Sequence, residues 1–111
     1  MNRSTAIFLL ALAALLEAGG DAIVRTALHR SAGASRFTLF VIGAIVLFLY
    51  GYVVNAPPWD FGRLLGLYVV FFFIAAQLIS WLAFGQPPSW AVLIGGLLII
   101  SGGLVISLSE A

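Results

Sequence analysis

The sequence predicts an all-α membrane protein with four transmembrane helices joined by short loops. Of its 111 residues, 63% are hydrophobic and only 8% are charged, whereas soluble domains carry roughly 25% charged residues. A chain of this size cannot bury so many apolar side chains within itself, so lipid must solvate them. The apolar residues lie in four runs close to the ~20 residues of a spanning helix, without the alternation of barrel strands.

The four runs define the predicted helices of a single domain, residues 1–111. We expect the helices at about residues 5–27, 37–54, 63–84 and 89–108. Polar or proline-containing breaks separate them, at residues 29–36, 55–60 and 85–88. Because the breaks are short, consecutive helices are expected to be antiparallel neighbours. The first apolar run is too long for a signal peptide, so we expect no cleavage.

The composition excludes several classes of function. The chain has five basic residues, all arginine, and lacks the basic patch that nucleic-acid binding requires. It contains no cysteine and a single histidine, so we expect no disulfide, metal site or cofactor. No nucleophile and base stand together in the sequence, and we therefore do not expect an enzyme.

Glu17 is the most informative residue, because it lies in the middle of the first apolar run. A charged carboxylate at the bilayer centre costs on the order of 2.5–3.5 kcal/mol, judged from the comparable aspartate. Such a residue usually faces a partner, a water-filled cavity or a substrate, and it marks ion and proton pathways. We favour that interpretation over a protonated or hydrogen-bonded glutamate with a structural role.

Three further polar residues follow Glu17 at intervals of four, namely Asp21, Arg25 and His29, so all four share one helix face. We expect Asp21 and Arg25 to form an ion pair toward the membrane surface. Glu17 then lacks a local counter-charge, and burial should keep it protonated until a cation approaches. Arg25 and His29 are interpreted as a polar helix end, whereas Asp21 fits that role and a second site acid equally well.

Other residues suggest how the helices approach Glu17. Gly20 removes a side chain near the acid and lets a neighbouring helix or a ligand come close. In the third helix, Tyr68 offers a hydroxyl donor to a carboxylate and a ring face to a cation, unless it serves only packing. Gln77 is expected to form a hydrogen bond to another helix, and Trp81 is expected to pack.

Glycines also form two stripes along the fourth helix. Gly95 and Gly102 are seven residues apart, as are Gly96 and Gly103, so each pair returns to one face after two turns. Such stripes favour close helix contact within a chain or between chains. Four helices leave little room to enclose a site, and we therefore favour a dimer.

Aromatic residues near the segment ends are expected to lie in the membrane–water interface, where amphipathic rings are favourable. These are Tyr50, Tyr52, Trp59 and Trp90.

The third and fourth helices resemble those of the small multidrug resistance family of four-helix transporters. The run LISWLAFGQ, residues 78–86, looks like the SWxFFGQ-type segment of that family. Gly95 and Gly102 follow at the spacing of the dimer stripe in the family's fourth helix.

The first helix is also similar to that family. Glu17, followed by Gly20 and Arg25, is similar to the family's essential membrane glutamate, its nearby glycine and a basic residue that closes the helix. Tyr68 falls where the family has an aromatic residue in its binding site. The pair Gly62–Arg63 before Tyr68 looks more like the YnfA-type relatives.

The resemblance implies a proton-coupled efflux transporter for small cationic or hydrophobic compounds, located in the inner cell membrane. It implies an antiparallel homodimer in which two copies of Glu17 bind protons and substrate in turn. The arginines themselves, three on one side and two on the other, leave parallel and antiparallel assembly open.

Three alternatives remain. The first is a transporter or helper subunit for a lipid-linked or metabolite substrate on the same fold. The second, less favoured, is a small dual-topology ion channel. The third is a structural or regulatory membrane protein, in which Glu17 would tolerate substitution.

Overall fold

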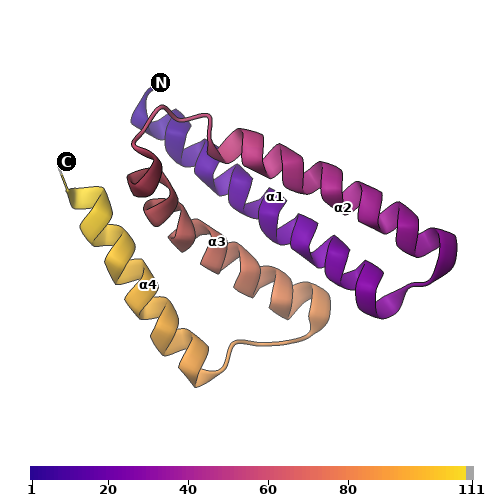
Figure 1. Ribbon diagram of the computed structural model, residues 1–111. Helices are drawn as coiled ribbons and strands as arrows, with labels where there is room; N and C mark the ends of the chain where they lie inside the picture. Colours follow the sequence, from indigo (N-terminus) through magenta and orange to yellow (C-terminus); the bar gives the residue numbers. More distant parts are fainter. Residues whose placement is uncertain (110–111) are drawn as a thin grey trace.

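A computed structural model describes residues 1–109 and confirms the all-α fold with four long helices (Figure 1). The helices are α1 (Arg3–Arg30), α2 (Gly33–Val54), α3 (Phe61–Phe84) and α4 (Trp90–Leu108). Each is long and apolar enough to cross a membrane. The chain is therefore a multi-pass membrane protein.

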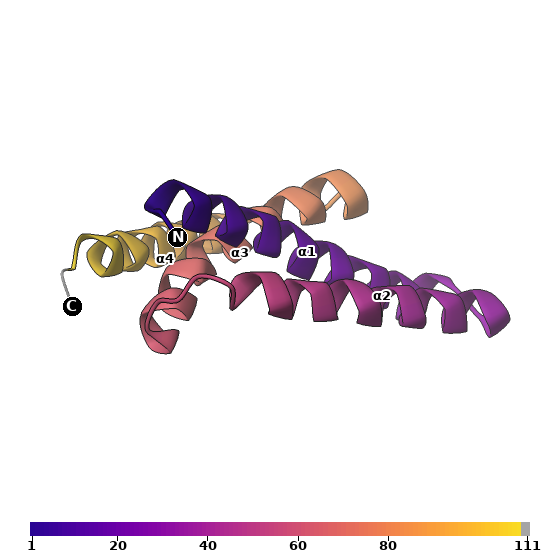
Figure 2. The same ribbon diagram turned by 90° about the horizontal axis from the view of Figure 1, so that it is seen from above.

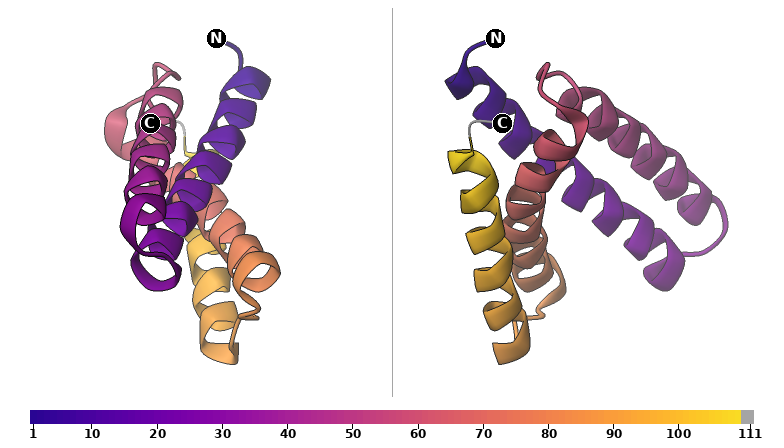
Figure 3. Two further views of the ribbon diagram at one scale, coloured as in Figure 1. Left: turned by 90° about the vertical axis from the view of Figure 1, so that its right-hand side faces the viewer. Right: turned by 60° about the vertical axis from the view of Figure 1, so that its left-hand side comes forward.

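The helices form two antiparallel hairpins, α1–α2 and α3–α4, which are inclined to each other (Figures 1 and 3). Helix α1 packs against α2 and also against α3, whereas α4 packs on α3. As a result α1 and α3 run in the same direction side by side. The four helices spread sideways instead of closing round one axis (Figure 2), and the molecule measures 51 × 34 × 19 Å.

The core lies where α1 meets α2 and α3. Small side chains dominate the α1 surface there, and in lipid such residues let helix backbones come close enough for van der Waals contact. The α1 residues that belong to this core are Leu10, Ala13, Ala14 and Ala18. Their partners are Val54 of α2 and Leu64, Tyr68 and Ala75 of α3.

The first loop is much shorter than the expected break at residues 29–36. Helix α1 continues to Arg30 and α2 already begins at Gly33, whose φ is +62°. The Arg36 side chain explains this tight turn, because its Nε donates to the Ala27 carbonyl at 3.0 Å and its Nη2 to the Ser31 carbonyl at 2.7 Å. It thus satisfies carbonyl groups that a helix end leaves unpaired.

The other two turns lie where the proline residues indicated. Residues 55–60 join α2 to α3, with Pro57 buried. Gly85 ends α3 with a left-handed φ of +65°, and its N–H bonds back to the carbonyls of Ser80 and Trp81. Ser89 is the N-cap of α4, because its hydroxyl accepts a hydrogen bond from the Val92 N–H at 3.2 Å.

The two glycine stripes of α4 differ in their surroundings. A methyl group at Gly96 would lie 2.6 Å from Cε1 of Phe73, and one at Gly103 would overlap the Val70 side chain. The Gly96–Gly103 stripe therefore lets α4 pack against α3. Within residues 1–109, no heavy atom beyond the neighbouring residues and the local helix backbone would lie within 4 Å of a methyl group at Gly95 or Gly102, so that stripe is open in the described part of the chain.

Because the two stripes differ in their surroundings, alanine should change the stability of the chain differently at Gly103 and at Gly102. Gly103→Ala should destabilise the α3–α4 hairpin by about 1–3 kcal/mol, because Val70 must move. Gly102→Ala should leave the free energy of unfolding of the single chain unchanged or slightly raised, since alanine is the better helix former. Unfolding by SDS titration, followed by circular dichroism on the monomeric protein, measures both. Equal losses would contradict the described packing.

Candidate functional site

A hydrogen bond between α1 and α3 fixes the predicted acid. The hydroxyl of Tyr68 donates to Oε1 of Glu17 at 2.8 Å, and both residues lie in the middle of their helices. Tyr68 is only 4% exposed and Glu17 is half-buried. Ala14 and Ala18 on either side of the acid are buried in the same core, so small side chains allow α3 to reach Glu17.

Two aromatic rings flank Tyr68. The ring centroid of Tyr50, from α2, lies 5.7 Å from that of Tyr68, and the centroid of Phe72 lies 6.4 Å away. These separations are typical of favourable tilted ring pairs. The donor to Glu17 is therefore held by rings from two different helices.

Tyr50 is the residue whose place sequence reasoning missed. We expected it in the interface belt, but it is half-buried against Tyr68, whereas Tyr52 two positions later is 74% exposed. A helical signal was present, because Tyr50 lies one turn before Val54, which belongs to the core. The expectation of an interface position used only the distance of Tyr50 from the end of its helix. It did not consider which face of the helix carries Tyr50.

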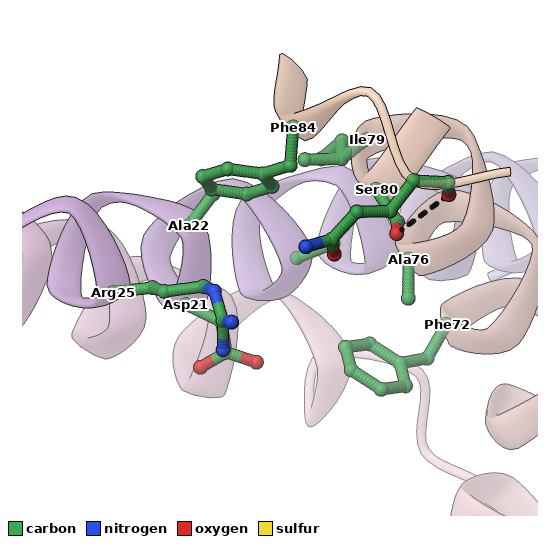
Figure 4. A pocket seen from close by; sticks show the side chains of 10 residues that line it. Asp21, Ala22, Arg25, Phe72, Ala76, Ile79, Ser80 and Phe84 are labelled. Carbon is green, nitrogen blue, oxygen red and sulfur yellow. Dashed lines mark hydrogen bonds between the residues drawn. The ribbon is translucent and has the colours of Figure 1, made fainter. Parts of the chain in front are cut away.

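A groove of about 320 Å³ opens beside this cluster, between α1 and the second half of α3 (Figure 4). Its polar lining consists of Asp21, Arg25, Ser80 and Gln86, and its aromatic lining of Phe72 and Phe84. Phe72 contacts Tyr68 and also lines the groove. The groove therefore begins next to the Tyr68–Glu17 pair and extends toward the α3–α4 loop.

The expected ion pair between Asp21 and Arg25 is absent from the structure of residues 1–109, so that expectation was wrong. The guanidinium carbon of Arg25 instead lies 5.9 Å from the ring centroid of Phe84, and that of Arg30 lies 5.2 Å from the same centroid. A guanidinium is attracted to the face of an aromatic ring. Phe84 thus competes with Asp21 for Arg25.

The remaining predicted residues lie outside this groove. Gly20 marks the close approach of α1 and α2, since a methyl group there would lie 2.7 Å from Cδ2 of Leu47. Gly95 and Gly102 are on α4, which packs mainly on α3 and contacts α1 through the hydrogen bond that Arg3 donates to the Ser107 hydroxyl at 2.8 Å. Trp81 was expected to pack, yet it is 56% exposed. Within residues 1–109, no three His, Asp or Glu side chains gather as a metal site would require.

Comparison with known proteins identifies the family. Residues 1–110 match the family described as "Uncharacterised BCR, YnfA/UPF0060 family". The chain belongs to the YnfA/UPF0060 family. A UPF0060 membrane protein from Clostridium perfringens (strain SM101 / Type A) is 31% identical over 108 residues, which are 96% of this chain and 95% of the relative. No solved structure matches.

Membership of the YnfA/UPF0060 family agrees with the YnfA-like pair Gly62–Arg63 before Tyr68. The wider likeness to small multidrug resistance transporters stays a prediction. The family establishes a membrane protein, whereas the residues that act in it have to be argued from the site.

The Tyr68–Glu17 bond predicts a spectroscopic effect. Tyr68→Phe keeps the ring but removes the donor, so the infrared carboxyl band of Glu17 should move to higher frequency in the variant. The band is assigned by its loss in Glu17→Gln. Tyr52→Phe serves as the matched control, because Tyr52 is exposed on α2 and should leave the band unchanged. An unshifted band in Tyr68→Phe would contradict the described bond.

Proposed function

We propose that this protein is a proton-coupled efflux transporter for small cationic or hydrophobic compounds. The observation that carries the proposal is the carboxyl group of Glu17, held in the middle of α1 by Tyr68 and next to a groove with polar and aromatic walls. An acid at that depth favours a proton or a cation as its ligand. We propose a transport role and not an enzymatic one.

Coupling follows if proton and substrate compete for Glu17. A cation that binds the carboxylate must displace the proton, and a proton must displace the cation, so neither binds independently of the other. Proton uptake on one side of the membrane then releases substrate there. The Tyr68 hydroxyl can bond either form of the acid, since it acts as donor or acceptor.

A second copy of the chain would complete the chamber. The groove beside Glu17 is open at the surface of the single chain, and the four helices lie in a flat spread. The open Gly95–Gly102 stripe on α4 offers a smooth face for close helix contact between two copies. We therefore propose a homodimer with two copies of Glu17 near its centre, and the arginine balance leaves its parallel or antiparallel arrangement open.

An apolar groove supports one competing function, transport of a lipid-linked substrate or a helper role in it. This groove of about 200 Å³ lies on the same α1–α3 pair and is lined by alanine, leucine, isoleucine and phenylalanine side chains. It suits an alkyl chain better than a hydrated cation. Native mass spectrometry distinguishes the functions, because bound lipid that survives purification favours the second.

The pH dependence of binding tests the proposed coupling. If each bound cation displaces one proton from Glu17, log Kd should fall by about one for each unit that pH rises, in the range where free Glu17 is protonated. Binding of n-alkylamines and tetraalkylammonium ions to purified protein in detergent, with simultaneous measurement of proton release, gives this slope. In Glu17→Gln both the slope and the release should vanish.

Asp60→Asn is the matched control for that experiment, since Asp60 lies in the loop before α3 and its loss should change neither quantity. Circular dichroism checks that both variants fold. Proton-coupled uptake into liposomes that persists in Glu17→Gln would sink the proposal.

A further inference from the structure

The groove between α1 and α3 holds two opposite charges that do not pair with each other. Asp21 and Arg25 are four residues apart on one face of α1, about 6 Å along the axis, in the order that favours an ion pair. Both line the groove (Figure 4), yet they form no ion pair within residues 1–109, and the Arg25 guanidinium carbon lies 5.9 Å from the centroid of the Phe84 ring. The groove therefore presents a separated negative and positive group to whatever enters it.

Arg25 keeps its hydrogen-bonding capacity in this position. The Arg25 guanidinium carbon lies 5.9 Å from the Phe84 ring centroid, and this cation–π contact does not need its five N–H groups as hydrogen-bond donors. Arg25 makes no hydrogen bond to residues 1–109. Arg36 differs, because its side chain is bound to carbonyl groups of the first turn.

The two ends of the groove have opposite charge. Toward the membrane centre lie Asp21 and, one turn deeper, Glu17. Toward the helix ends lies Arg25, whereas Arg30, which contacts the same Phe84 ring, lies outside the groove lining. Beyond the deep end of the groove, the titratable groups on the other helices are Tyr68 of α3, which donates to Glu17, and Tyr50 of α2, which packs on Tyr68.

We infer that the groove selects substrates that carry an anionic group beside their cation, with the cation at the acidic end, where Asp21 lies one turn from Glu17 and the proton is displaced, and the anion at Arg25. This inference rests on the proposed transport function and names its substrate class. The ligand is a zwitterion whose charges are about 6 Å apart, joined by an apolar spacer. Ala22, Ala76 and Phe72 line the groove where that spacer would lie.

Electrostatics favours the zwitterion over a simple cation. A monocation at Asp21 meets the positive field of Arg25 one turn away and leaves that guanidinium without an anion. Both side chains are exposed in the single chain, and a zwitterion pairs both of them through charge-assisted hydrogen bonds, which are the stronger kind. A site with both charges thus discriminates through attraction of one ligand and repulsion of the other.

Two matched pairs of compounds test the inference, n-butylamine with 4-aminobutanoate and n-pentylamine with 5-aminopentanoate. Each pair shares its ammonium group and chain length and differs in the carboxylate. Titration calorimetry with proton release on the purified protein gives the affinity ratio of amino acid to amine. We expect a ratio on the order of ten in the wild type.

Three variants assign that ratio to residues. Arg25→Gln should reduce the ratio to one or less while proton release by the amine persists. Arg30→Gln is the control, since Arg30 stacks on the same ring but does not line the groove, and it should keep most of the ratio. Glu17→Gln should abolish proton release by both compounds.

The possible outcomes distinguish failure of the zwitterion inference from failure of the proposed transport function. Proton release by the amines together with a wild-type ratio of one or below would overturn the inference and leave the proposed function standing. A ratio that is unchanged in Arg25→Gln, with both affinities raised, would overturn it too, because Arg25 would then serve only to neutralise Asp21. No proton release with any compound would overturn both.

Discussion

The hydrogen bond from Tyr68 to Glu17 is the constraint on which the arrangement of α1 and α3 depends. A carboxyl group in the hydrocarbon region needs a polar partner, and lipid offers none. The partner must come from another helix, so the two backbones have to approach closely at the depth of Glu17. Buried alanines on α1 permit that approach, and the rings of Tyr50 and Phe72 hold the donor in place.

Small residues decide the rest of the packing for a related reason. Between helices in lipid there is little hydrophobic driving force, because lipid tails are as apolar as leucine side chains. Contact depends instead on backbones that come close, and this occurs at Gly20 against α2 and at Gly96 and Gly103 against α3. A mainly apolar helix such as α4 can then pack on one neighbour and still present a second glycine face outward.

The arginines at the loop ends of α1 and α2 have different roles, although they have the same chemistry. Arg36 satisfies backbone carbonyls and shortens the first loop, whereas Arg25 and Arg30 lie over Phe84. Because a guanidinium has a ring-binding face and a hydrogen-bonding edge, Arg25 holds α1 near α3 without using its N–H groups. Arg25 therefore contributes both to the contact between the ends of α1 and α3 and to the polar lining of the groove.

The sequence by itself determined the number and order of the helices and singled out Glu17. Whether a segment enters lipid depends on the hydropathy of that segment alone. A spanning helix and an acid within it can therefore be recognised without knowledge of the tertiary structure. Partners are a tertiary property. Tyr50 packs on Tyr68, and Arg25 contacts Phe84 and forms no ion pair with Asp21. These contacts depend on which helix faces meet and on the distances between the helices. The first loop shortened for the same reason, since only the folded hairpin brings Arg36 to the carbonyls at the end of α1.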